Sequence, residues 1–307
     1  MNTIVATRDL CKRYDGEYRV NHVNLTVYEG EVYGFLGPNG AGKSTTLKML
    51  LGLAKPTSGQ IAIFGKALNS NRRKILQETG SLIESPSYYG HLTGLENMRI
   101  MQQLRNVPDK NVMEALQIVR LDKHKDKKVG QYSLGMKQRL GIAMALIAFP
   151  RLLILDEPTN GLDPAGIGEI RELIRSLPQR YGITVLISSH LLSEIEQIAT
   201  SVGIIGNGKL LFQGSMEELR SKKQSAISIR TMNDAAAARL LFDSGIVPLA
   251  GIIGKQPAMH FNGMTDSEAA RANRLLVQAG IDVVRIEEHK QSLESIFLEL
   301  TGKEKSL

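Results

Sequence analysis

The sequence predicts an α/β protein with an inserted helical subdomain and a small α+β domain at its C-terminal end. Residues 1–215 alternate short apolar runs with helix-like patterns, which is typical of a core sheet with parallel strands. From about residue 80 to residue 147 helical patterns dominate and strand-like alternation is missing. After residue 225 strand and helix patterns alternate again in a shorter module. The predicted domains are residues 1–220, with the helical subdomain at about 85–147, and residues 221–307.

The strand candidates of the core are four apolar runs. Two of them, 151–155 and 184–188, are almost continuously apolar, as strands buried on both faces should be. The stretch 202–212 contains Asn207-Gly208, a dipeptide suited to the type I′ turn of a β-hairpin. The other two candidates are 31–36 and 59–64.

Helical patterns define the insert and the C-terminal module. The insert is expected to contain helices at 95–104, 109–119 and 134–147. Ser215 and Glu218 form a capping-box pattern for a short helix, and the domain boundary falls just after it. The later elements form a β-α-β-β-α-β pattern that carries no catalytic motif. They are strand 226–230, helix 234–243, strands 246–253 and 257–262, helix 266–279, strand 281–287 and helix 292–300.

The composition excludes several classes of protein. Of the 307 residues, 42% are hydrophobic and 22% are charged, as in an ordinary globular protein. The most apolar stretch, 142–155, is broken by Pro150 and Arg151 and is shorter than the roughly 20 apolar residues that cross a bilayer. The N-terminal residues lack the features of a signal peptide, so we expect a cytoplasmic location. The single cysteine, Cys11, cannot form an internal disulfide, and we interpret it as a small buried residue.

The net charge of +7 fits nucleic acid, an anionic membrane surface or phosphate ligands. The one dense basic run, 123–128, also contains His124 and Asp126, and we interpret it as a solvated loop. Only 5% of the residues are aromatic and none is Trp, which leaves little material for stacking on bases. No nucleic-acid partner is therefore expected.

A complete phosphate-binding loop follows the apolar run 32–36 and precedes the helix-like run 46–51. Glycines in such a loop let backbone N–H groups converge on phosphate oxygens. Lys43 is expected to reach the β- and γ-phosphates of ATP, and Ser44 to bind Mg²⁺. The matching residues are Gly37, Pro38, Asn39, Gly40, Ala41, Gly42, Lys43, Ser44 and Thr45.

Two acids end the apolar run 152–155. Asp156 and Glu157 should therefore lie at the C-terminal edge of the sheet, where ligands bind in open α/β folds. Asp156 is the candidate Mg²⁺ acid. Glu157 is the candidate general base for the water that attacks the γ-phosphate.

Four further segments resemble those of a known family, the ABC ATPase subunits. The segment 132–138, Tyr-Ser-Leu-Gly-Met-Lys-Gln, resembles the family's signature, and 160–164, which contains Asp163, resembles its D-loop. His190 resembles the switch histidine, and Tyr14 resembles the aromatic residue that stacks on adenine. The resemblance covers residues 2–220 and implies the fold of a phosphate-loop NTPase of the ABC type.

The resemblance also implies how the site is completed. Ser133 should cap the helix that follows it, and a helix N-terminus is suited to binding an anion. In the family this end, with Ser133 and Gly135 here, holds the γ-phosphate of ATP on the opposite subunit, which implies a homodimer. The usual wording Leu-Ser-Gly-Gly-Gln is changed to Tyr-Ser-Leu-Gly-Met, but the serine and the second glycine are kept. His190 should contact the γ-phosphate and help to hold water.

Glu84 stands where the family normally has a glutamine that touches Mg²⁺ and senses the transport partner. A carboxylate is a harder oxygen ligand than an amide, and Mg²⁺ should accept it. We hypothesise that Glu84 takes the glutamine's role. This glutamate, the Glu-Ser-Pro stretch 84–86 and the C-terminal extension resemble the bacitracin-resistance and lantibiotic-immunity branch, whose pumps export peptide antibiotics.

The expected function is ATP hydrolysis that drives a membrane transporter, with separate transmembrane permease subunits as partners on the cytoplasmic face of the membrane. One alternative is a soluble ABC ATPase that acts on nucleic acid or ribosomes. Such proteins usually have tandem ATPase units or a long coiled coil, and this chain has one phosphate loop and no heptads. Another alternative is a nucleotide sensor without hydrolysis, against which Glu157 and His190 argue.

Overall fold

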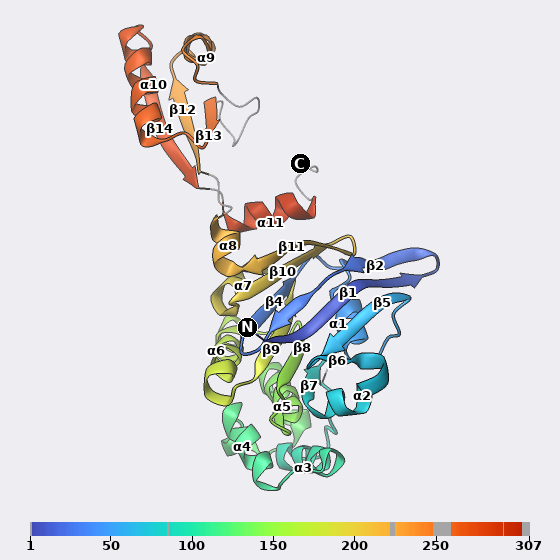
Figure 1. Cartoon of the computed structure of the whole chain (residues 1–307). Coiled ribbons are helices and arrows are strands. Elements are labelled where there is room, and N and C mark those ends of the chain that lie inside the picture. The colour runs from blue at the N-terminus through green and yellow to red at the C-terminus, as the bar shows by residue number, and fades with distance from the viewer. Residues whose placement is uncertain (1, 85, 222–224, 248–258, 291, 303–307) are drawn as a thin grey trace. The chain divides into compact units, whose positions relative to one another are not determined.

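The computed structural model describes residues 2–84, 86–221, 225–247, 259–290 and 292–302. The chain divides into two compact units, one formed by Met1–Met216 with Leu300–Leu307 and one formed by Glu217–Glu299. The predicted α/β class is confirmed, because both sheets and helices build the first unit (Figure 1). Among the described residues, no helix combines the length and apolar character needed to cross a membrane.

A six-stranded sheet forms the centre of the first unit. Its strand order is β11-β10-β4-β9-β8-β7, and all neighbours are parallel except the hairpin of β10 and β11. Asn207 and Gly208 have φ angles of 48° and 77°, as a type I′ turn requires. The strands β8 and β9 are buried along their whole length, as predicted, and β4 is buried along its whole length as well. The bounds are β4 (Val32–Leu36), β7 (Thr79–Leu82), β8 (Leu152–Asp156), β9 (Thr184–Ser189), β10 (Ser201–Gly206) and β11 (Lys209–Ser215).

One strand that was predicted for the parallel core lies instead in a second, antiparallel sheet. The strand predicted at 59–64 was assigned to the parallel core, but β5 (Ser58–Ile63) pairs antiparallel with β1 (Thr3–Tyr14), with Val5 opposite Ile63. The second half of β5 alternates, with Ile61 and Ile63 buried and Ala62 partly exposed, as is typical of antiparallel strands with one solvated face. The remaining members are β2 (Glu17–Val23), β3 (Thr26–Tyr28) and β6 (Lys66–Ala67).

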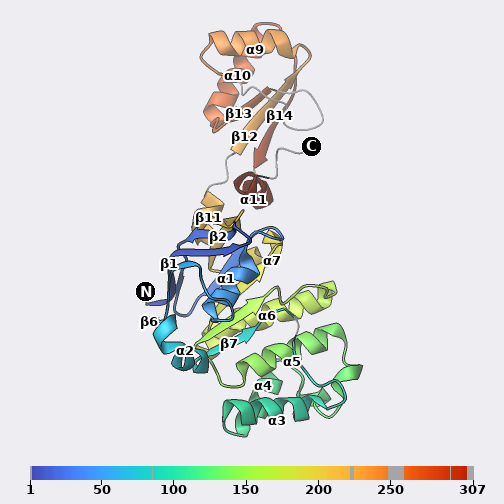
Figure 2. The ribbon, with the colours of Figure 1, turned by 90° about the vertical axis from the view of Figure 1, so that its right-hand side faces the viewer.

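Helices connect and cover the two sheets. The helix α1 (Lys43–Leu50) contacts β2 of the antiparallel sheet and β8 of the parallel sheet, and so lies between them (Figure 2). Its buried Leu47 and Leu50 join one core with residues of both sheets. The helices α6 (Pro164–Tyr181) and α7 (Leu192–Ile198) pack against β4 and β9, and α2 (Leu68–Gln77) packs against β5 and β7.

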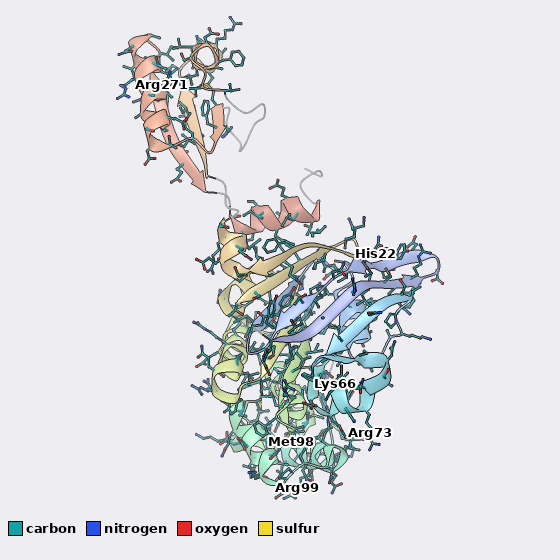
Figure 3. The ribbon with its side chains drawn as sticks, viewed as in Figure 1. His22, Lys66, Arg73, Met98, Arg99 and Arg271 are labelled. Atoms are coloured by element: carbon teal, nitrogen blue, oxygen red, sulfur yellow. The ribbon has the colours of Figure 1, made fainter. Side chains whose placement is uncertain are left out.

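The helical subdomain contains α3 (Gly94–Arg105), α4 (Lys110–Ile118) and α5 (Leu134–Leu146), close to the predicted ranges. Figure 3 shows Met98 among the packed side chains of this subdomain and its neighbour Arg99 at the outer edge. Of two short 3₁₀ turns, η1 (Asp122–His124) includes the start of the basic run 123–128, and η2 (Val129–Gln131) directly follows it.

The second unit has its own core. Its antiparallel sheet has the order β13-β12-β14, and its core joins the fully buried Ile229 of β12, Leu241 of α9 and Leu276 of α10. The strand predicted at 246–253 falls almost entirely outside the described residues. The bounds are α8 (Met216–Ser221), β12 (Ser225–Thr231), α9 (Asp234–Asp243), β13 (Met259–Asn262), α10 (Asp266–Gln278), β14 (Val283–Lys290) and α11 (Leu293–Thr301).

Candidate nucleotide-binding site

Three neighbouring parallel strands end side by side and bring distant segments together. Leu36 at the end of β4 pairs with Ser189 of β9, and Ser188 of β9 pairs with Asp156 of β8. The next residues of the three strands, Gly37, His190 and Glu157, therefore start three adjacent loops at the C-terminal edge of the sheet. This edge is where open α/β sheets bind ligands.

The phosphate loop requires glycine at a close approach. Gly42 has φ +108°, and a Cβ built on it would lie 2.5 Å from the carbonyl oxygen of Arg19. Any L side chain there would be strained and would clash with β2. The helix α1 begins at the next residue, so its N-terminus faces the loop and favours bound anions.

Glu157 lies between Lys43 and His190. The Lys43 Nζ atom is 3.2 Å from Glu157 Oε1 and donates to the carbonyl oxygens of Gly37 at 2.7 Å and Pro38 at 3.3 Å. On the other side, His190 Nδ1 is 3.1 Å from Glu157 Oε2. Lys43 is only 4% exposed, so the Glu157 carboxylate and the two carbonyl oxygens stabilise its charge in place of water.

The two acids at the end of β8 are held by β9. The Ser188 hydroxyl donates to Asp156 Oδ1, and the backbone N–H of Glu157 donates to Ser188 Oγ at 3.0 Å. Asp156 is buried, and Glu157 has a positive φ of 47°, which turns the chain sharply after the strand. One serine therefore holds both the Asp156 carboxylate and the backbone of Glu157.

Lys43, Asp156 and Glu157 border a cavity of about 760 Å³. Its lining combines cations, from Arg19, Lys43 and Lys137, with the acids Glu84, Asp156 and Glu157. Such a site can hold phosphate oxygens at one end and a metal and water at the other. The predicted residues that line the cavity are Asn39, Gly40, Gly42, Lys43, Ser44, Thr45, Glu84, Asp156 and Glu157.

Glu84 forms an ion pair with Lys48 of α1, with Nζ and Oε1 2.6 Å apart. The Lys48 hydrogen bond and charge lower the pKa of Glu84, and the same hydrogen bond raises the pKa of Lys48. Smaller contributions to the raised Lys48 pKa come from Asp156 and Tyr14, so Lys48 lies within electrostatic reach of both. Glu84 also has a left-handed backbone, with φ 62°. The sequence did not point to Lys48.

The other predicted residues lie around the cavity rather than on its lining. Gly37, Pro38 and Ala41 form the inner part of the phosphate loop. Tyr14, at the end of β1, is 46% exposed. The Lys12 ammonium is 4.8 Å from the centre of its ring, a cation–π contact.

The signature and D-loop segments share one surface. Ser133 caps α5 by accepting a hydrogen bond from Met136 N, and Asp163 caps α6 by accepting one from Gly166 N. Between them Leu134 is 54% exposed and packs against Gly161, while Gly135 faces Leu162. Two helix N-termini are thus presented together at the protein surface.

The donor set fits Mg²⁺. The Ser44 hydroxyl and the carboxylates of Asp156 and Glu84 border the same cavity. Within the described part of the chain, no group of three His, Cys, Asp or Glu side chains forms a metal site. The few oxygen donors of Ser44, Asp156 and Glu84 suit Mg²⁺, because this ion usually keeps several water and phosphate ligands.

Sequence reasoning missed several polar residues of the site. Ser188 and Ser189 were part of the segment before His190, but only strand pairing shows that Ser188 reaches Asp156. No sequence pattern pointed to Arg19, because the strand that contains it, β2, was not predicted. Glu194 and Thr159 lie buried behind His190 and are joined by a hydrogen bond.

The parallel sheet, the phosphate loop and the acid pair beside it define a phosphate-loop ATPase with an inserted helical subdomain. The family described as "ABC transporter" matches residues 20–160. "Bacitracin transport ATP-binding protein BcrA" of Bacillus licheniformis is 45% identical over 98% of both chains. "Lantibiotic transport ATP-binding protein SrtF" of Streptococcus pyogenes is 45% identical over 67% of this chain and 88% of its own length.

Solved structures agree with these relatives. An "ATP binding subunit of ABC transporter" matches with a TM-score of 0.64 and 30% identity, over 72% of this chain and 93% of the other. A dimeric ATP-binding cassette in a post-hydrolysis state with ADP and Pi matches with a TM-score of 0.63 and 26% identity, over 69% and 99%. The chain belongs to the family of ABC transporter ATP-binding proteins. It is an ATP-hydrolysing transporter subunit, and the alternative of a nucleic-acid ATPase finds no support.

Proposed function

We propose that this chain drives the export of a peptide antibiotic, of the bacitracin or lantibiotic type, from the cytoplasmic face of the membrane. The support is the 45% identity to a bacitracin transport protein along nearly the whole chain. It is strengthened by the 45% identity to a lantibiotic transport protein across the ATPase unit. The cargo itself would be contacted by separate permease subunits.

The position of Glu157 between Lys43 and His190 carries the proposed catalytic roles. When ATP enters, Lys43 exchanges its carbonyl and carboxylate partners for phosphate oxygens. Glu157 is then free to accept a proton from the attacking water, and His190 orients that water from the other side. Tyr14 would stack on adenine at the rim of the cavity.

Three residues would hold Mg²⁺: Ser44, Asp156 and Glu84. The metal would neutralise charge on the phosphate oxygens. Ser188 keeps Asp156 in place for this role through its hydrogen bond.

Two copies of the chain would close around two ATP molecules. The exposed caps at Ser133 and Asp163 and the small Gly135 form a surface suited to the phosphate end of a nucleotide on a second copy. The dimeric relative with ADP and Pi supports this arrangement.

A groove beside Glu84 would receive a permease helix. The groove has a volume of about 220 Å³ and is lined by residues of β7, α3 and α5, including Leu82, Met101 and Met144. Methionine side chains adapt to partners of different shape. Because Glu84 borders the nucleotide cavity and its neighbour Ile83 borders this groove, Glu84 would couple the two events. In Glu84→Ala we therefore expect hydrolysis to separate from transport.

The test replaces Glu157 with glutamine in the complex with the permease. Glu157→Gln should still bind ATP, because Lys43 and the phosphate loop are unchanged, but hydrolysis should fall by roughly 10²–10⁴. Phosphate release, ATP binding and the bacitracin resistance of cells that carry the complex are measured together, with Glu172→Gln on α6 as the matched control.

Each outcome bears on a different part of the proposal. Wild-type turnover in Glu157→Gln would mean that another residue is the base. Active wild-type ATPase with no gain of resistance to bacitracin or to a lantibiotic would refute the cargo alone.

A further inference from the structure

Glu194 is a buried acid for which the catalytic scheme has no use. It lies in the first turn of α7 and is 5% exposed. A carboxylate withdrawn from water is costly unless hydrogen bonds compensate it. Its Oε2 atom accepts two such bonds, from Thr159 Oγ1 at 2.7 Å and from Ser189 Oγ at 2.9 Å.

The two donors belong to two different loops of the site. Thr159 lies in the turn that joins Glu157 to the D-loop segment, and this turn is closed by the hydrogen bond from Asn160 N to Glu157 O at 3.1 Å. Ser189 directly precedes His190. Its hydroxyl oxygen also accepts the backbone N–H of Leu191 at 3.0 Å, so it fixes the chain on both sides of the histidine.

Glu194 and its two hydrogen-bond partners lie beside the catalytic residues but do not line the nucleotide cavity. A second cavity of about 190 Å³ is bordered by Thr159, His190, Glu194 and Glu157. Glu157 borders both this cavity and the larger one, whereas Glu194 borders only the smaller. Glu194 can therefore act on the reaction only through the loops that it holds.

A purely structural role would need no such connection. The helix α7 has seven residues, and an acid that only served its N-terminus could remain in solvent. Here one oxygen atom of Glu194 accepts hydrogen bonds from hydroxyl groups of both loops. Displacing either loop would therefore leave the buried carboxylate with one hydrogen bond fewer. The two loops are thereby constrained to move together.

We propose that Glu194 is a positioning residue that keeps His190 in register with Glu157 by tying the His190 loop to the turn after Glu157. This inference rests on the proposed catalytic roles of Glu157 and His190. It further means that a movement of the D-loop segment at the dimer surface reaches His190 through Thr159 and Glu194.

The test compares Glu194→Ala with Glu194→Gln, Thr159→Val and Ser189→Ala in the complex with the permease. Glu194→Ala should lower kcat about tenfold or more and leave KM for ATP within about twofold, because phosphate binding is untouched. Glu194→Gln keeps the volume and one acceptor oxygen, so it should restore most of the lost rate. Thr159→Val and Ser189→Ala should each lower kcat, and neither should lower it further in the Glu194→Ala background.

The control is Glu196→Ala on the same helix, which should match wild type, and thermal unfolding is followed for every variant. If Glu194→Ala does not fold, the two hydroxyl variants decide, and wild-type kcat in both would overturn the proposal. Independent effects that multiply in the double variants would also overturn it. A loss of rate in Glu157→Gln beside a normal Glu194→Ala would refute this inference and leave the proposed function standing.

Discussion

At the scale of the residue, Lys48 and Glu84 form an ion pair at the nucleotide cavity. The two side chains are 37% and 68% exposed, and ion pairs this accessible contribute little to stability. Their position is more informative, since Glu84 borders the cavity that also contains Ser44 and Asp156. The pair therefore decides whether the carboxylate is available to a metal.

A magnesium titration of the ATPase tests this role. Glu84→Gln should raise the Mg²⁺ concentration needed for half-maximal activity several-fold, because a neutral amide is a weaker ligand than a carboxylate. Lys48→Met should lower that concentration, because it releases the carboxylate from its ammonium partner.

The double variant provides the control. In a Glu84→Gln background Lys48→Met should change nothing further, since no charged partner remains. An equal effect of Lys48→Met in both backgrounds would show that Lys48 acts independently of Glu84.

At the scale of the element, helix ends carry much of the local order. The helix α3 begins with a capping box in which Glu96 N donates to Thr93 Oγ1 and Thr93 N donates to Glu96 Oε2. The backbone N–H and the hydroxyl of Thr93 are the main causes of a lowered pKa of Glu96. The half of the box that the Glu96 carboxylate forms therefore stabilises the helical subdomain more when Glu96 is ionised.

This predicts a pH dependence with a definite sign. A carboxyl group with a lowered pKa in the folded state stabilises that state above its ordinary pKa of 4.5, and the contribution is lost as the pH falls below it. Compared with Glu96→Gln, the wild-type protein should melt at a higher temperature at pH 7, and the difference should vanish below the folded-state pKa. Thermal unfolding from pH 7 to about pH 3 measures it.

The matched control is Glu114→Gln on α4, whose side chain takes no part in the box. A difference between wild type and Glu96→Gln that persists unchanged at low pH would contradict the assignment.

At the scale of the whole molecule, the chain contains two units with separate cores. Leu241 and Leu276 belong to the core of the second unit, whereas Leu47 and Leu186 belong to that of the first. Because no core residue is shared between these clusters, a cavity in one should leave the packing of the other unchanged.

Leu241→Ala should therefore destabilise the second unit by about 2–5 kcal/mol, the usual cost of such a buried truncation. ATP affinity should be unchanged, because the nucleotide cavity belongs to the first unit. Calorimetry and ATP binding are the measurements, and Leu186→Ala, which should weaken the first unit, is the reciprocal control. Equal loss of ATP binding in both variants would show that the two units fold as one.

The sequence by itself determined the features that depend on neighbouring residues. The phosphate loop around Lys43 and the acid pair that ends β8 are local patterns of this kind. The helix cap at Ser133 is also local, and so is the type I′ turn at Asn207-Gly208. Such patterns can be predicted without the fold, because the backbone geometry they need is set within a few residues.

Only the tertiary structure decided which of these patterns meet. The pairing of β4, β9 and β8 brings Lys43, His190 and Glu157 to one edge, and the antiparallel sheet takes β5 away from the parallel core. The contacts of Glu194 with Thr159 and Ser189 likewise join residues that no sequence pattern relates. Contacts of this kind depend on strand register and on the burial of side chains from distant segments, and both are fixed only when the whole chain packs.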